Sequence, residues 1–141
     1  MKSSTQQITV FLIHAHQDKE TVFKIYQRLF KDGFDVWLDS EKLEPGQNWQ
    51  REIRKAILKS DAVLVCLSQN FNEQHGYRHE ELKLALEKAK LLDDRVFIIP
   101  VRIEDCDMPE CLKHLHRVDL FEPLGYKKMI GALQQLEPVD E

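Results

Sequence analysis

The chain alternates short runs of hydrophobic residues with longer stretches in which hydrophobic residues recur every three or four positions. The short runs are rich in β-branched and aromatic residues and predict strands, whereas the longer period predicts amphipathic helices. The predicted strands cover residues 8–14, 34–38, 62–67, 96–101 and 118–121. The predicted helices lie between Asp18 and Gly33, from Trp49 to beyond Ile57, from Glu80 to near Leu92, and from Tyr126 to Leu136.

Local signals indicate where several of these elements begin and end. Asp18 is expected to cap the first helix and Asn48 the second, and Gly33 is expected to end the first. Residues 68–77 are polar and are expected to form a loop. Pro100 has no amide hydrogen for a sheet ladder, so it is expected at the end of its strand.

Regular alternation of strands and helices predicts a doubly wound α/β domain with right-handed crossovers. Residues 62–67 are apolar at every position, as is typical of a parallel strand buried on both faces. The expected fold is flavodoxin-like, a five-stranded parallel sheet of order 2-1-3-4-5 with helices on both faces. Ligands of such sheets bind beyond the carboxyl ends of the strands, which selects residues 14–18, 39–48 and 68–81.

Composition narrows the class of protein. The 141 residues are 43% hydrophobic and 31% charged, which is typical of one globular domain. We expect this domain to cover residues 8–136, with a disordered segment at 1–7 and a tail at 137–141. The net charge of −4 gives no basic surface for nucleic acid.

The sequence also bears on the cellular compartment. No apolar run approaches the roughly 20 residues of a membrane span, and the polar N-terminus does not resemble a signal peptide. The odd number of cysteines indicates reduced thiols, so a cytoplasmic location without membrane contact is expected. The three cysteines are Cys66, Cys106 and Cys111.

Two adjacent acids, Glu80 and Glu81, begin the helix that follows the third strand. Glu81 lies four positions before Ala85 on the inward stripe of this helix, so its carboxylate can lean toward the sheet, whereas Glu80 is rotated about 100° away. A catalytic acid at the ligand edge is one interpretation. The more common one is that both acids complement the dipole of the helix.

Aromatic residues occur near the same edge. Trp37 and Trp49 flank the loop after the second strand, and Tyr77 precedes the candidate helix. Such rings suit a planar ligand such as a nucleobase or nicotinamide, although packing is an alternative, favoured for Trp37.

Other kinds of site find no support in the sequence. It contains neither the glycine fingerprint of a dinucleotide-binding fold nor a P-loop. His114 and His116 have no third ligand at suitable spacing, so we predict no metal site. The receiver domain of two-component signalling has the same strand order but requires an acceptor aspartate at the end of the third strand. Ser68 stands there, so this alternative is set aside.

Five segments, in order, resemble the TIR (Toll/interleukin-1 receptor) family in its bacterial form. The family's motifs resemble VFLIHAHQDK (10–19), GFDVWLDSEKLEPGQNW (33–49), SDAVLVCLSQNF (60–71), GYRHEELKLAL (76–86) and IIPVRIEDC (98–106). Together they extend over most of the chain.

This resemblance implies an enzyme that cleaves the bond between nicotinamide and ribose in NAD+, with NAD+ as substrate and no cofactor. The glutamate of the family's fourth motif corresponds to Glu81, which becomes the candidate catalytic residue. Its carboxylate would stabilise the positive charge that develops on the ribose. The product would be ADP-ribose or a cyclic isomer. The remaining implied substrate-binding residues are His14, Ala15, Trp49, Ser68 and Tyr77.

The resemblance also implies partners. Other TIR domains would bind through the loop at 39–48, in which Asp39, Leu43, Pro45 and Gly46 are the expected assembly residues. Self-association would activate the enzyme in bacterial anti-phage defence or signalling, with a sensor or effector protein acting in trans. The alternative is a non-catalytic module that acts only through such assembly.

Overall fold

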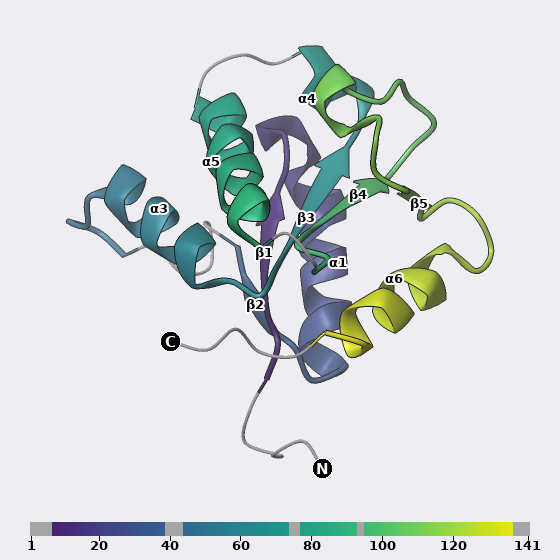
Figure 1. The fold of residues 1–141 in the computed structure, drawn as a ribbon, viewed down its shortest axis with the longest axis horizontal. Coiled ribbons are helices and arrows are strands. Elements are labelled where there is room, and N and C mark those ends of the chain that lie inside the picture. The colour runs from purple at the N-terminus through teal and green to yellow at the C-terminus, as the bar shows by residue number, and fades with distance from the viewer. Residues whose placement is uncertain (1–6, 39–43, 74–76, 93–94, 137–141) are drawn as a thin grey trace.

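The computed structural model describes residues 7–38, 44–73, 77–92 and 95–136. Five parallel strands form one sheet in the order β2-β1-β3-β4-β5 (Figure 1). The strands are β1 (Thr9–Ile13), β2 (Asp35–Trp37), β3 (Ala62–Leu67), β4 (Ile98–Arg102) and β5 (Val118–Asp119). The predicted flavodoxin-like fold and its strand order are therefore confirmed.

The helices connect the strands across both faces of the sheet. The α-helices are α1 (Lys19–Lys31), α3 (Trp49–Lys59), α4 (Gln69–Glu73), α5 (Tyr77–Leu91) and α6 (Gly125–Gln134). Two short 3-10 helices, η1 (His16–Asp18) and η2 (Glu110–Leu112), lie in the connections.

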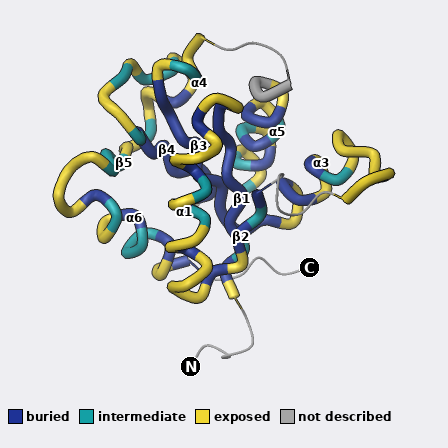
Figure 2. The backbone as a smooth tube through the Cα atoms, turned by 180° about the vertical axis from the view of Figure 1, so that it is seen from behind, coloured by how far each residue is buried: buried dark blue, intermediate teal, exposed yellow. Residues whose placement is uncertain are grey.

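The hydrophobic core has two layers, one on each side of the sheet. Successive side chains of a strand point to opposite faces. Accordingly, Val10 and Leu12 of β1 pack with α1 and α6, whereas Phe11 and Ile13 pack with α3 and α5. All six residues of β3 are buried, as predicted for a strand covered on both faces (Figure 2).

Two of the predicted end signals are confirmed and one is not. The Asn48 side chain accepts a hydrogen bond from the Arg51 amide and caps α3. Gly33 follows α1 with a φ of 95°, a conformation that favours glycine. Asp18 does occupy the N-cap position of α1, but its side chain makes no capping hydrogen bond.

The segment after β3 also differs from the prediction. Residues 69–73 form the short helix α4 instead of a loop, and α5 begins at Tyr77, three residues before the predicted start at Glu80. Both segments are polar, so no apolar stripe signals the additional helical turns.

Pro100 lies in the middle of β4, so its predicted place at the end of the strand is wrong. The Phe97 carbonyl accepts a hydrogen bond from Val63 of β3 at 2.7 Å. Peptide groups alternate along a strand, so those of Pro100, three residues later, face the opposite side. There β5 pairs only with residues 101–102, so no partner requires the missing amide hydrogen of Pro100.

Candidate active site

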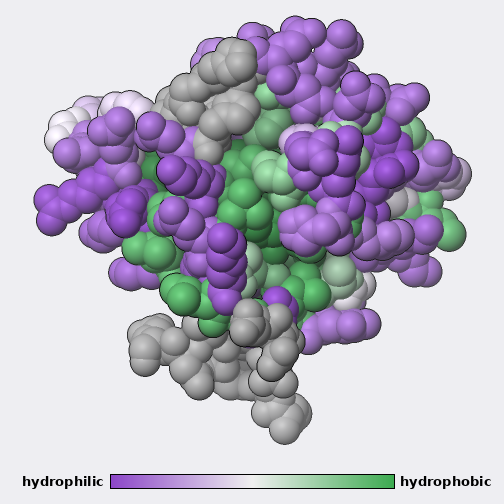
Figure 3. Space-filling model, turned by 45° about the horizontal axis from the view of Figure 1, so that its top comes forward, coloured by the Kyte–Doolittle hydropathy of each residue, from purple (hydrophilic) through white to green (hydrophobic). Residues whose placement is uncertain are grey.

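The predicted ligand edge is formed where β1 and β3 end side by side. These two strands pair in parallel up to Ile13 and Val65, so the residues that follow them emerge at one edge. Helix α5 begins at this edge and packs back against β1 and β4. In the view that brings the top of Figure 1 forward, hydrophilic residues surround a central group of hydrophobic ones (Figure 3).

Glu81 is buried near the start of α5. The residue is 6% exposed and precedes Leu82 and Ala85, which pack into the core beneath α5. Glu80 is exposed. The predicted orientations of the two acids are thus confirmed.

The position of Glu81 also bears on the helix-dipole interpretation. Because α5 begins at Tyr77, Glu81 is the fifth residue of the helix and lies beyond the first turn, where the dipole favours acids. An acid that only complements a dipole also has no need to be buried, and burial of a carboxylate is costly. The helix-dipole interpretation therefore does not account for the position of Glu81, which stays a candidate site residue.

Three of the predicted binding residues lie together at the ends of β1 and β3. His14, Ala15 and Ser68 are all buried. The Ala15 carbonyl is 2.8 Å from Nδ1 of His14 and accepts a hydrogen bond from the Asp18 amide at 3.0 Å. The Ser68 hydroxyl donates to the Asp18 carboxylate. Asp18 thereby joins the segment after β1 to the segment after β3.

The structure defines the positions of the other predicted site residues in less detail. Trp49 begins α3 and is 42% exposed, as expected for a rim position and not for core packing. Tyr77 begins α5, but its side chain lies outside the described residues. Asp39 and Leu43 also lie outside them.

The remaining assembly residues, Pro45 and Gly46, are exposed in the turn before α3. The φ of 91° at Gly46 explains the glycine at this turn.

Asp18 and Asn70 belong to this edge but are not among the predicted site residues. The Asn70 amide donates to Oδ1 of Asp18 at 3.0 Å. Asp18 is read from sequence as a helix cap because its partners stand 50 and 52 positions away. Its place directly after a predicted strand at the ligand edge is the signal that could have indicated a further role.

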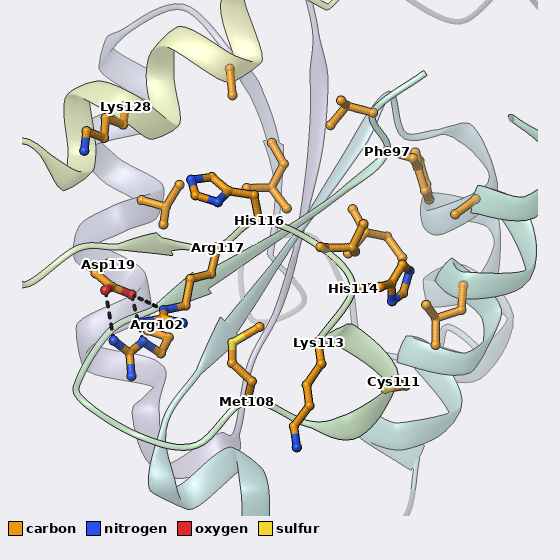
Figure 4. Close-up of a pocket in the computed structure, with 18 of the residues that line it drawn as sticks. Phe97, Arg102, Met108, Cys111, Lys113, His114, His116, Arg117, Asp119 and Lys128 are labelled. Atoms are coloured by element: carbon orange, nitrogen blue, oxygen red, sulfur yellow. Dashed lines mark hydrogen bonds and ion pairs between the residues drawn. The ribbon is translucent and has the colours of Figure 1, made fainter. Parts of the chain in front are cut away.

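A pocket lies on the β5 side of the sheet (Figure 4). It is bordered by α5, β4, β5, the segment around η2, and α6, and none of the predicted site residues lines it. His114 and His116 are exposed there. Among the described parts of the chain, no group of three or more His, Cys, Asp or Glu residues is arranged to hold a metal ion. The buried acid at the first edge makes that edge the better candidate for chemistry.

An ion pair joins β4 to β5 beside this pocket (Figure 4). Arg102 of β4 binds Asp119 of β5 through two hydrogen bonds of 2.7 and 2.9 Å, and Arg117 adds a third at 3.1 Å. Arg102 also donates to Asp105 and to the Cys106 carbonyl. The hydrogen bond from Arg102 lowers the pKa of Asp119 below its ordinary value of 3.8.

This lowered pKa predicts how the stability of the domain depends on pH. Asp119 stabilises the fold above about pH 3.8, and this contribution is lost as the pH falls through the lower pKa of the folded state. We therefore expect Asp119→Asn to lower the melting temperature at pH 7 and the difference from wild type to shrink below pH 4. Thermal melts between pH 7 and 2 test this; a difference that stays constant over that range would contradict it.

Most of the chain matches the model of one protein family. Residues 10–136 match the family model of the TIR domain. The chain belongs to the TIR domain family. No helix in the described parts of this TIR domain has the length and apolar character needed to cross a membrane.

Relatives of this TIR domain are larger proteins. The uncharacterized protein y4cD of Sinorhizobium fredii is 32% identical over 130 residues, which cover 90% of this chain and 20% of that protein. The NAD(+) hydrolase TcpA of a Theionarchaea archaeon is 36% identical over 93 residues, which cover 65% of this chain and 27% of that protein. The chain thus spans about a quarter or less of their lengths.

Among solved structures, the TIR domain of the Toll-related receptor TRR-2 from Hydra magnipapillata has the same fold. Its TM-score is 0.76 at 21% identity, over 89% of this chain and 98% of that one.

Proposed function

We propose that this TIR domain cleaves NAD+ between nicotinamide and ribose, with Glu81 as the catalytic residue. The observation that carries the proposal is the burial of Glu81 in the second turn of α5, at the edge where β1 and β3 end. A relative at 36% identity bears the name NAD(+) hydrolase, which supports the same reaction class.

The chemistry needs only one carboxylate. When the bond between C1′ and the ring nitrogen breaks, its electron pair passes to the nicotinamide, which leaves as a neutral molecule and needs no general acid. The ribose becomes positively charged, and a buried Glu81 carboxylate stabilises that charge because little water screens it. Water then bonds to C1′ and releases a proton to give ADP-ribose; capture by a hydroxyl of the same molecule gives a cyclic isomer.

The surrounding residues have proposed binding roles. His14, Ala15 and Ser68 would border the ribose from the ends of β1 and β3, where the structure buries all three. Trp49 and Tyr77 would supply aromatic surfaces for the planar rings.

We also propose that self-association raises the activity. The exposed turn at Pro45 and Gly46 is available to another TIR domain. A sensor or effector in trans would promote this assembly in bacterial defence or signalling. The free cysteines suit the reducing cytoplasm, where such a protein would work.

The decisive test follows nicotinamide release from NAD+ by chromatography, with the purified protein free in solution and fused to a clustering scaffold. We expect slow release by the free protein, faster release on clustering, and ADP-ribose or its cyclic isomer in equal amount. No release by the clustered wild type would refute the enzymatic proposal and favour a module that acts by assembly alone.

Trp49 offers a separate prediction. Because Trp49 is 42% exposed, Trp49→Ala is expected to change the melting temperature by only a few degrees. Loss of a stacking surface should raise the KM for NAD+ by roughly 10-fold. Steady-state kinetics and a thermal melt of the same preparation test both parts. A collapsed thermal transition would instead assign Trp49 to core packing.

A further inference from the structure

The carboxylate of Asp18 is buried at the same edge as Glu81, and its hydrogen bonds point away from the helix that it precedes. Asp18 stands at the N-cap of α1, where an aspartate ordinarily accepts from the first amides of the helix. It makes no such bond. Its two oxygens instead accept from Ser68 and Asn70, both in the segment after β3. The stabilisation available from capping is therefore given up for a long-range contact.

The contact requires a carboxylate. The Ser68 hydroxyl donates to Oδ2, and the Asn70 amide donates to Oδ1. A carboxylate has two acceptor oxygens, whereas the amide of asparagine has one acceptor and one donor group. An acid is costly to bury, and this pair of donors accounts for its presence here.

This contact fixes the start of α4. The Ser68 oxygen accepts from the Phe71 amide at 3.0 Å, so the same hydroxyl that donates to Asp18 also caps α4. From the β4 side, Glu104 accepts from the Gln69 amide at 2.9 Å, and the Asp107 carbonyl accepts from the Asn72 side chain at 2.8 Å. The segment between β3 and α5 is thereby held from two neighbouring loops.

Asp18 also connects to the other proposed binding residues. Its amide donates to the Ala15 carbonyl at 3.0 Å, and the same oxygen lies 2.8 Å from Nδ1 of His14. One residue thus bonds to the segment after β1 through its backbone and to the segment after β3 through its side chain.

We infer that Asp18 is a positioning residue of the substrate site. Its contacts hold Ser68 in place beside His14 and Ala15. The inference rests on the proposed cleavage of NAD+. Asp18 acts through Ser68 and does not itself touch the reacting atoms. Loss of its carboxylate frees the Ser68 hydroxyl to turn and lets the two segments separate, so substrate binding weakens while the reaction at Glu81 continues.

The experiment compares Asp18→Asn, Ser68→Ala and the double variant, as clustered proteins, in steady-state NAD+ cleavage. A matched control is Asp61→Asn. Asp61 is also buried and also joins β1 to β3, by accepting from the Thr9 amide at 2.8 Å, but it does so at the opposite edge of the sheet. Circular dichroism selects a temperature at which all the proteins are folded.

We expect Asp18→Asn to raise KM about 10-fold with kcat within about threefold of wild type. Ser68→Ala should do the same, and the double variant should be no worse than the poorer single variant, because both changes break the shared contact between Asp18 and Ser68. Asp61→Asn should leave both constants within about twofold of wild type. A merely destabilising change lowers the folded fraction and therefore the apparent kcat, with KM unchanged.

An unchanged KM in Asp18→Asn, or losses that multiply in the double variant, would overturn the inference while wild-type activity upholds the proposed function. If the clustered wild type binds NAD+ without cleaving it, Kd values measured by calorimetry take the place of KM. An unchanged Kd in Asp18→Asn, or losses of affinity that multiply in the double variant, would then overturn the inference. A wild type that neither cleaves nor binds NAD+ would overturn both proposals.

Discussion

Replacing Glu81 with glutamine is expected to lower kcat for nicotinamide release by about 100-fold or more without lowering the melting temperature. Glutamine keeps the shape of the side chain but carries no charge to stabilise the developing positive ribose. Because Glu81 is buried, a neutral amide at this position costs less desolvation than a carboxylate. Steady-state kinetics on clustered protein and a thermal melt measure the two effects separately.

The adjacent acid provides the matched control. Glu80 directly precedes Glu81 in α5 but is exposed, so Glu80→Gln makes the same chemical change outside the core. It should retain kcat within about twofold, since an exposed charge is screened by water. Equal rates for Glu81→Gln and wild type would remove Glu81 from the catalytic role.

The second large effect concerns folding and arises at Gly125, the first residue of α6. A Cβ atom built at this position would collide with the carbonyl oxygen of Asp119 and would lie 2.9 Å from the Cα of Leu120. Both contacts are to backbone, so no side-chain rotation can relieve them. Gly125→Ala is therefore expected to reduce the free energy of unfolding by about 3 kcal/mol or more. Denaturant titration followed by circular dichroism measures the loss.

Gly131, in the same helix, is the control: Gly131→Ala measures how much alanine changes the free energy of unfolding where it meets no neighbour. A Cβ there would meet nothing within 4 Å. Gly131→Ala should stabilise the domain by about 0.5–1 kcal/mol, because alanine favours helix more than glycine does. If Gly125→Ala were as stable as Gly131→Ala, the close approach of α6 to the end of β5 would be incorrect.

Much of the fold could be predicted because its signals are periodic and local. The apolar run at 62–67 predicts the bounds that β3 has in the structure, and strand–helix alternation limits the order of a parallel sheet to few choices. The inward orientation of Glu81 followed from its spacing to Ala85 on the helical stripe. Both features depend on neighbours within a few positions.

The features that were missed depend on residues far apart in the chain. Local sequence predicts that Asp18 caps a helix because α1 follows it directly, whereas Ser68 is 50 positions away. Helix α4 lacks an apolar stripe and receives contacts from Glu104 and Asp107, which are more than 30 positions later. Single-sequence patterns do not encode such pairings, so they emerge only from the folded arrangement.

The proline in the middle of β4 has a consequence for the sheet's open margin. Along most of β4, the side facing β5 has no partner strand within the sheet, because β5 is only two residues long. Exposed strand margins invite pairing with strands of other molecules, which leads to aggregation. Pro100 presents no amide hydrogen on that margin, so an incoming strand would find an interrupted ladder. If the domain self-associates as proposed, it thereby lacks one route to uncontrolled aggregation.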